Sequence, residues 1–324
     1  MNRTCPCCFG NAAPLFEVGD LNRLRSRQKF SYFRCLTCGT VFLDPVPVDL
    51  AHYYGGDYPA YRKPSDHELA GLTLQESHKV EILKRYATSG RLLEIGSSYG
   101  AFLYAASQEG FIPEAIEMDA ECCAYIRQRF GATVHQAVDV LATLSGLGTY
   151  DVITLWHVIE HLADPVSIIE TAAEHLAPGG ILIIAAPNPE SLEFRLFRRF
   201  WVHLDAPRHI RFLPLGFVGQ IAERSGLTEV FSASTGESEA PFNTFGWFRW
   251  SLQHLLTGCA SFGGTKPPSC NEQPCSVLQK RKSRFSPGVV VDRVLKVVYD
   301  VLWKPVINRT GRSNSYTIVL RKAL

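Results

Sequence analysis

The chain has 324 residues, 46% of them hydrophobic, and a formal net charge of +2. This length can bury a full α/β core with one or two smaller units, and its longest apolar stretches are too short or too charged to span a bilayer. Ten cysteines follow a start, Met1-Asn2-Arg3, that does not resemble a secretory signal, which favours thiols or metal binding over a disulfide scaffold and predicts a cytoplasmic protein.

Two C-x-x-C pairs mark the N-terminal segment. They comprise Cys5 with Cys8 and, after 26 residues, Cys35 with Cys38. Four thiolates at this spacing can hold one structural zinc ion tetrahedrally, and so short a segment lacks a core of its own. Cys7 could replace Cys8 as a ligand. The spacing predicts a zinc-stapled module.

Residues 52–61 form a tyrosine-rich connector with tyrosines at positions 53, 54, 58 and 61. Tyrosine combines an apolar face with a hydroxyl, so this segment could grip a sugar or an aromatic substrate. It could equally pack the zinc module onto the next domain. Residues 68–88 then show helical periodicity.

Residues 91–100, RLLEIGSSYG, carry the motif around which the predicted fold is organised. They predict a strand that ends near Glu94, a turn bracketed by Gly96 and Gly100, and the start of a helix. In a doubly wound sheet this arrangement holds a nucleotide-like ligand at the carboxyl end of the strand. The next predicted strand, 112–116, leads to Glu117, about 20 positions after the turn, where a ribose-binding carboxylate is expected.

Five further strands are predicted at 133–137, 151–157, 181–186, 228–234 and 315–320. Trp156 and His157 lie at the carboxyl end of the fourth strand, where ligands of open α/β sheets bind. His157, Glu160 and His161 form an H-x-x-E-H pattern, and we do not interpret it as a zinc site. The loop 198–212 carries more polar chemistry than a connector requires, including Arg208 and His209.

The segment 240–312 separates the sixth strand from the last. It carries 11 Lys+Arg against 3 Asp+Glu, a net charge of +8, whereas the rest of the chain carries −6. Two apolar helices, 245–256 and 289–303, flank a Gly- and Pro-rich stretch with a basic run at 279–284. A membrane contact through 245–304, a lid and a dimer surface are three interpretations of this insertion.

The motifs LLEIGSSYGAF, AIEMD, YDVITLWHVIEHLADP and LAPGGILIIAAPNPES together resemble the class I S-adenosylmethionine-dependent methyltransferases over residues 80–235. The resemblance implies a Rossmann-like, doubly wound, seven-stranded methyltransferase sheet, preceded by a small zinc-ribbon-like module and with a helical insertion before the last strand. Ser98 stands where the family usually has the middle glycine of its motif. The implied donor-binding residues are Glu94, Gly96, Ser98, Gly100, Glu117, Asp139 and Trp156.

The same resemblance places His157 beside the transferred methyl group and makes Asp139 a candidate contact of the adenine, although a solvated loop aspartate fits as well. The segment 201–212 is similar to a W…D-x-P-x-H-x-x-F segment of related methyltransferases. It makes His209 a second candidate general base and Arg208 a candidate ligand of an anionic substrate group. Histidine suits a base near neutral pH, and the two histidines are not ranked.

The zinc module before such a core also resembles the deoxysugar C-methyltransferases, although Arg208 replaces their usual acidic partner of the histidine. We therefore expect a small-molecule acceptor, such as a saccharide or a lipid-linked glycan, with S-adenosylmethionine as donor and zinc as a structural ion. An RNA base methyltransferase and a non-catalytic S-adenosylmethionine-binding protein are the alternatives. Nucleic acid is disfavoured because residues 1–45 are not strongly basic.

The expected organisation has four parts: a zinc module and connector (1–62), a methyltransferase core (63–239), a helical, basic insertion (240–312) and the last core strand (313–324). The expected location is cytoplasmic, with peripheral membrane contact if the insertion binds lipid. The sequence carries no signal for the oligomeric state.

Overall fold

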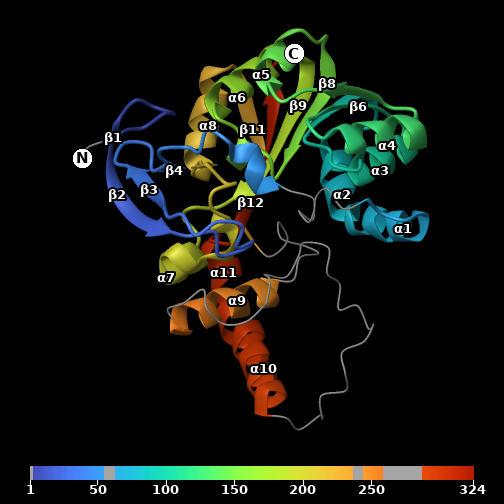
Figure 1. Cartoon of the computed structure of the whole chain (residues 1–324). Coiled ribbons are helices and arrows are strands. Elements are labelled where there is room, and N and C mark those ends of the chain that lie inside the picture. The colour runs from blue at the N-terminus through green and yellow to red at the C-terminus, as the bar shows by residue number, and fades with distance from the viewer. Residues whose placement is uncertain (1–2, 55–62, 236–243, 258–286) are drawn as a thin grey trace.

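A computed structural model describes residues 3–54, 63–235, 244–257 and 287–324 (Figure 1). Two β-sheets lie side by side, and a group of helices extends below them. Of the predicted connector, Tyr58 and Tyr61 lie outside the described residues, as does the basic run 279–284. No helix in the described parts of the chain is long and apolar enough to cross a membrane.

The larger sheet has seven strands in the order β11-β12-β9-β8-β5-β6-β7. Neighbouring strands from β7 to β9 run parallel, whereas β12 is antiparallel to both β9 and β11. The predicted doubly wound sheet is therefore confirmed. Its strands are β5 (Gly90–Ile95), β6 (Phe111–Glu117), β7 (Thr133–Gln136), β8 (Tyr150–Trp156), β9 (Leu176–Pro187), β11 (Leu227–Ala233) and β12 (Ser315–Lys322).

The apolar runs in the central strands are buried on both faces, as expected of parallel strands covered by helices. Successive side chains alternate between the faces: Leu92 packs with the core under α2–α4, whereas Leu93 packs with the core under α5, α6 and α8. Figure 1 shows these two groups of helices on opposite sides. The helices are α1 (Asp66–Gln75), α2 (Ser77–Tyr86), α3 (Ala101–Gln108), α4 (Ala120–Phe130), α5 (Val140–Ser145), α6 (Pro165–Glu174) and α8 (Leu215–Arg224).

The smaller sheet is antiparallel, in the order β1-β2-β3-β4-β10. Four strands come from the N-terminal segment: β1 (Arg3–Thr4), β2 (Asn11–Val18), β3 (Phe30–Cys35) and β4 (Val41–Leu43). The fifth, β10 (Arg211–Phe212), comes from the loop after β9 and pairs with Val41 and Phe42. Two segments about 170 residues apart in sequence thus form one sheet, and the helical turn η1 (Leu50–Tyr54) follows it.

The segment between β9 and β10 contains α7 (Leu192–Phe197) and the short turns η4 (Arg198–Phe200) and η5 (Val202–Leu204). The two helices predicted in the insertion are present as α9 (Thr244–Thr257) and α10 (Pro287–Val298). Helix α10 continues through a π-helical turn, η6 (Tyr299–Trp303), into α11 (Lys304–Thr310). Phe248 packs on Phe197, Tyr299 and Trp303 with ring centroids 5.1–5.6 Å apart, so this aromatic cluster anchors the insertion.

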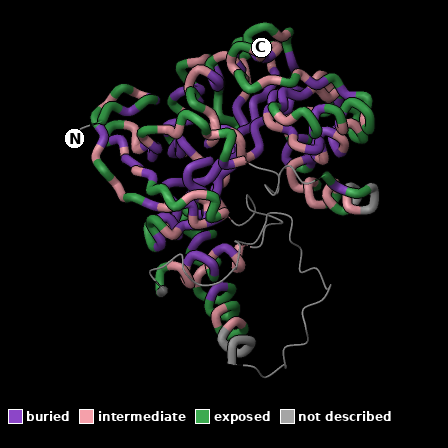
Figure 2. The backbone as a smooth tube through the Cα atoms, in the orientation of Figure 1, coloured by how far each residue is buried: buried purple, intermediate pink, exposed green. Residues whose placement is uncertain are grey.

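Below that anchor, α10 projects away from both sheets (Figures 1 and 2). Its large apolar side chains are exposed: Val294 is 58% exposed and Val297 is 61% exposed. Beyond the helices the chain returns to the core, where Asn314 accepts a hydrogen bond from the indole of Trp201 at 2.7 Å and donates one to Glu193 at 2.6 Å. These buried contacts fix the entry of β12 into the sheet.

Candidate functional site

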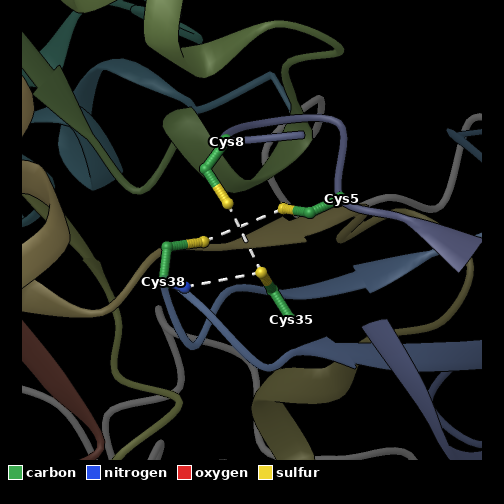
Figure 3. A group of neighbouring side chains, drawn as sticks. All are labelled: Cys5, Cys8, Cys35 and Cys38. Atoms are coloured by element: carbon green, nitrogen blue, oxygen red, sulfur yellow. Dashed lines mark hydrogen bonds between the residues drawn. The ribbon is translucent and has the colours of Figure 1, made fainter. Parts of the chain in front are cut away.

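The four predicted cysteine ligands come together between β1 and the β3–β4 turn, with their sulfur atoms pointing toward one another (Figure 3). The Sγ atoms of Cys5 and Cys38 are 3.8 Å apart, and those of Cys8 and Cys35 are 3.4 Å apart. Four thiolates at about 2.3 Å from one zinc ion would be about 3.8 Å apart. Cys7 is not part of this group.

Backbone amides also point at these sulfurs. Cys7 donates to Cys5 Sγ at 3.4 Å, and Thr37 and Cys38 donate to Cys35 Sγ at 3.3 and 3.4 Å. Such hydrogen bonds favour thiolates, the form that binds metal. The donor set, the spacing and the amides all fit a closed four-thiolate metal site.

The glycine turn follows β5, and its glycines are required by packing within the chain. Gly96 has φ +75°, and a Cβ there would lie 2.4 Å from Cγ2 of Val158. Gly100 has φ +73°, and a Cβ there would lie 2.9 Å from Ile126. Both positions need the left-handed backbone that glycine adopts without strain. Ser98 also has a positive φ, +51°, which explains why a glycine is usual at this position of the motif.

Glu117 lies at the end of β6 and faces this turn. Its Oε2 accepts the amide of Ser98 at 2.8 Å, and its Oε1 accepts the amides of Met118 and Asp119 at 2.8 and 2.9 Å. Burial raises its pKa, although these three amides act in the opposite direction. The structure therefore joins the predicted ribose-binding carboxylate to the glycine turn.

Three buried polar groups in or beside the turn have no hydrogen-bond partner among the described residues: Oε2 of Glu94, Oγ of Ser97 and Nε1 of Trp156. Glu94 is 3% exposed, and burial raises its pKa to about 8. Trp156 packs edge-on against Phe102, and the Lys79 ammonium lies 5.4 Å from its ring centroid. Buried polar groups are normally paired, so unpaired ones at a strand end indicate a place for a ligand.

Asp139 has a local role. It is exposed, and its Oδ1 accepts the amide of Ala142 at 3.0 Å, which caps the N-terminus of α5. A capping aspartate satisfies an otherwise unpaired amide of the first helical turn. The capping bond needs no ligand, and the adenine contact stays a prediction.

His157 directly follows β8 with a strained φ of +56°. Its neighbour Val158 packs against Gly96, so His157 lies at the glycine turn. Its Nδ1 is 3.8 Å from Oε1 of Glu160, a residue of the turn η3 (Ile159–His161). Burial lowers the pKa of His157 to about 3 and raises that of Glu160 to about 8. The imidazole is therefore neutral at pH 7.

His209 lies beside His161 rather than alone in its loop. The two rings meet edge to face with centroids 4.5 Å apart. His161 Nδ1 is 2.7 Å from the Tyr54 hydroxyl, and His209 Nδ1 is 2.7 Å from the carbonyl oxygen of His203. Burial lowers the pKa of His161 to about 3 and that of His209 to about 4. Tyr54 thus links the N-terminal segment to the histidines.

Arg208 corrects one expectation, because its guanidinium is fully buried and paired with carboxylates of the chain itself. It donates to both oxygens of Asp205 at 2.8 and 2.9 Å and to Asp20 at 2.7 Å. Burial alone would raise the pKa of Asp205, but Arg208 holds it well below its usual range. Arg208 therefore joins the loop to the N-terminal segment and does not bind an anionic substrate.

Asp20 was not among the expected functional residues. A single aspartate after a strand, at Val18-Gly-Asp20, carries no local pattern that distinguishes it from a turn residue. Its partner lies 188 positions away, so only the folded chain reveals the pair.

The strand order and the glycine-turn site define a Rossmann-like methyltransferase fold. Residues 67–231, half of the chain, match the model of a family described as a methyltransferase domain. The chain belongs to this family.

Two curated relatives are ubiquinone biosynthesis O-methyltransferases. The protein of Caulobacter sp. (strain K31) is 33% identical over 105 residues, which cover 30% of this chain and 41% of the relative. That of Haemophilus ducreyi is 26% identical over 135 residues, which cover 39% of this chain and 55% of the relative. The chain thus spans about half the length of these relatives, or less.

Among the solved structures that resemble this chain is an S-adenosylmethionine-dependent methyltransferase from Archaeoglobus fulgidus. Its TM-score is 0.47 at 17% identity, and the match covers 78% of this chain and 94% of that one. A protein from Thermotoga maritima described as a possible histamine N-methyltransferase has a TM-score of 0.46 at 14% identity, with 84% of this chain and 99% of that one covered.

Proposed function

We propose that this chain transfers a methyl group from S-adenosylmethionine to a small-molecule acceptor, with oxygen as the receiving atom. The observation that carries the proposal is the meeting of Glu117 with the glycine turn at the carboxyl edge of the sheet. Family membership supports the donor, and the O-methyltransferase relatives support an oxygen acceptor.

In this proposal Glu117 binds the ribose hydroxyls, and the turn Gly96, Ser98 and Gly100 lies along the donor. Glu94 and Trp156 offer polar atoms with no hydrogen-bond partner among the residues described. The sulfonium donor is already activated, so the protein mainly has to align acceptor and methyl group, which can lower the barrier by about 7–11 kcal/mol.

An acceptor hydroxyl must also lose its proton. Of the two candidate bases, His157 and His209, we favour His157 because it lies at the glycine turn and its Nδ1 faces Glu160. A positioned base contributes about 10²–10⁴-fold to the rate. The proton passes to the imidazole as the acceptor oxygen attacks the methyl carbon, and the donor leaves as S-adenosylhomocysteine.

We propose zinc as the ion of the cysteine cluster, with a structural role. Four thiolates leave no open coordination position, which is typical of structural rather than catalytic zinc.

We propose a saccharide or a lipid-linked glycan as the acceptor. The exposed apolar residues of α10 and the turns after it suit contact with a bilayer surface, where a lipid-linked acceptor would lie. Flotation of the protein with vesicles containing anionic lipid tests this contact. If the Val297→Asp and Val301→Asp variants floated with the vesicles as well as the wild type, this contact would be contradicted.

The function is tested by transfer of radiolabelled methyl groups to phenols, nucleotide-sugars, lipid-linked glycans and RNA. We expect labelling of one class of small or lipid-linked acceptor, and labelling of RNA alone would overturn the proposal. Glu117→Ala should weaken donor binding by about 10- to 100-fold, because it removes charged hydrogen bonds. Glu121→Ala, on the neighbouring helix, should bind the donor as the wild type does.

His157→Ala should lower turnover by about 10²–10⁴-fold while the dissociation constant of the donor stays unchanged. An equal loss of turnover and donor affinity would assign His157 to donor binding instead.

A further inference from the structure

Glu160, His161 and His209 form a second group of candidate metal ligands. Each offers one ligand atom, and the three atoms lie within 4.8 Å of one another. Glu160 and His161 come from η3 and His209 from the loop 48 positions later. The two segments are fixed together by a backbone hydrogen bond of 2.8 Å from the amide of Ile210 to the carbonyl of Glu160.

The carboxylate of Glu160 is the observation that points to a ligand. Glu160 is 1% exposed, and neither of its oxygens accepts a hydrogen bond from any residue that the structure describes. A buried carboxylate without hydrogen bonds is costly, and buried charges are normally paired or coordinate metals. The contact with His157 at 3.8 Å is too long for a hydrogen bond.

The two histidines present the nitrogens that a metal requires. His209 Nδ1 lies 2.7 Å from a carbonyl oxygen, which can only accept, so Nδ1 carries the proton and Nε2 the lone pair. His161 Nδ1 lies 2.7 Å from the Tyr54 hydroxyl and 3.2 Å from the carbonyl oxygen of Arg208, and metal binding through Nε2 requires the tautomer in which Nδ1 donates to one of these oxygens. A metal-binding histidine almost always donates its other ring N–H to a carbonyl or a carboxylate in this way.

We propose that Glu160, His161 and His209 bind a divalent transition-metal ion. Two imidazoles and one carboxylate suit zinc, iron(II), cobalt or manganese rather than calcium or magnesium. Three protein ligands leave at least one coordination position for water or an acceptor oxygen, in contrast to the closed cysteine cluster. His157 is outside this set, so only Glu160 and His161 of the H-x-x-E-H pattern take part, and His209 supplies the third ligand.

Cobalt(II) is a suitable probe because its visible absorption reports its ligands. The full-length protein is stripped of metal with a chelator and given one equivalent of zinc, which the thiolates take preferentially. Cobalt(II) is then titrated in without any methyl donor. We expect about one further ion per chain, with visible bands typical of nitrogen and oxygen ligands and no thiolate charge-transfer band.

Each ligand variant should bind cobalt at least about tenfold more weakly, because changes around a metal site typically reduce metal affinity 10- to 100-fold. The variants are His161→Ala, His209→Ala and Glu160→Gln. Glu160→Gln preserves shape and so guards against loss of folding in the alanine variants. His175→Ala, a histidine between α6 and β9, should bind like the wild type. Failure of the zinc-loaded wild type to bind a cobalt ion, or equal cobalt binding by Glu160→Gln, would overturn the proposal. Because no donor is present, this result is independent of the proposed reaction.

Discussion

The cysteine and Arg208 clusters beside the N-terminal sheet differ from the carboxyl edge of the larger sheet in how their buried polar groups are paired. Around the first, the four thiols face one another and receive amides, and the buried guanidinium of Arg208 is bonded to two carboxylates. At the second, polar atoms of Glu94, Trp156 and Glu160 have no hydrogen-bond partner among the described residues. Satisfied groups stabilise a fold, whereas unsatisfied ones at a strand end mark a place prepared for ligands.

This comparison predicts that substitutions in the first region cost stability and that substitutions in the second mainly affect binding. The largest effect is expected at the cysteine cluster. Cys8→Ala should abolish zinc binding and destabilise the fold by on the order of 5 kcal/mol or more, because metal binding contributes directly to folding. Zinc content by mass spectrometry and urea unfolding measure both effects.

Cys7→Ala is the matched control, since Cys7 is a buried neighbour outside the cluster. It should keep its zinc. Loss of zinc in Cys7→Ala with retention in Cys8→Ala would mean that Cys7 is the ligand.

The next effect concerns the buried ion cluster. Arg208→Met should cost about 3–5 kcal/mol in urea unfolding, because it leaves the carboxylates of Asp20 and Asp205 buried without their partner. Arg249→Met removes the exposed pair with Asp292, whose two side chains are each 46% exposed, and should cost less than about 1 kcal/mol. Similar costs for the two variants would break the comparison.

Glu94 tests the second region through pH. Its pKa is raised from 4.5 to about 8, so the folded state favours the protonated form. This contribution to stability is complete below pH 4.5 and is lost as the pH rises toward 8. Relative to Glu94→Gln, the wild type should lose about 1.4 kcal/mol per pH unit in this window.

Urea unfolding at pH 5, 6.5 and 8 measures this difference. Glu114→Gln is the control, because Arg91 lowers the pKa of Glu114 despite its burial. The contribution of Glu114 is lost only at acid pH, so its curve should parallel that of the wild type between pH 5 and 8. A constant difference between the wild type and Glu94→Gln would show that Glu94 is ionised in the folded protein.

The smallest effect is expected at Asp139. Asp139→Ala should destabilise the fold by about 1 kcal/mol through loss of the α5 cap, and Asp139→Asn by only a few tenths, because asparagine caps as well. Thermal unfolding measures both variants. Equal losses in the two variants would mean that the charge of Asp139, rather than its cap, stabilises the fold.

Much of the larger sheet could be predicted from sequence because its signals are local. Each strand is a short apolar run followed by a turn residue, and the seven predicted strands overlap the observed ones. The glycine turn and Glu117 belong to one βαβ unit, so a spacing of about 20 residues was enough to pair them. The C-x-x-C pairs are likewise recognisable by spacing alone.

The remaining features depend on contacts between distant segments. The pairing of Asp20 with Arg208, the approach of His209 to Glu160 and His161, and the strand β10 each join parts of the chain that no periodicity or motif relates. Arg208 was misinterpreted for this reason: a lone arginine in a polar loop resembles an anion ligand until its buried partners are known.

The pairing of β10 with β4 has a consequence for engineering and for evolution. The last strand of the small sheet comes from residues 211–212, far along the chain. The N-terminal segment alone therefore lacks one strand of its sheet and cannot be transferred to another enzyme as a complete unit. Deleting it would strip a neighbour from Arg211–Phe212 and leave a bare backbone edge available for self-association. An evolutionary or engineered exchange of the small sheet would therefore have to include β10.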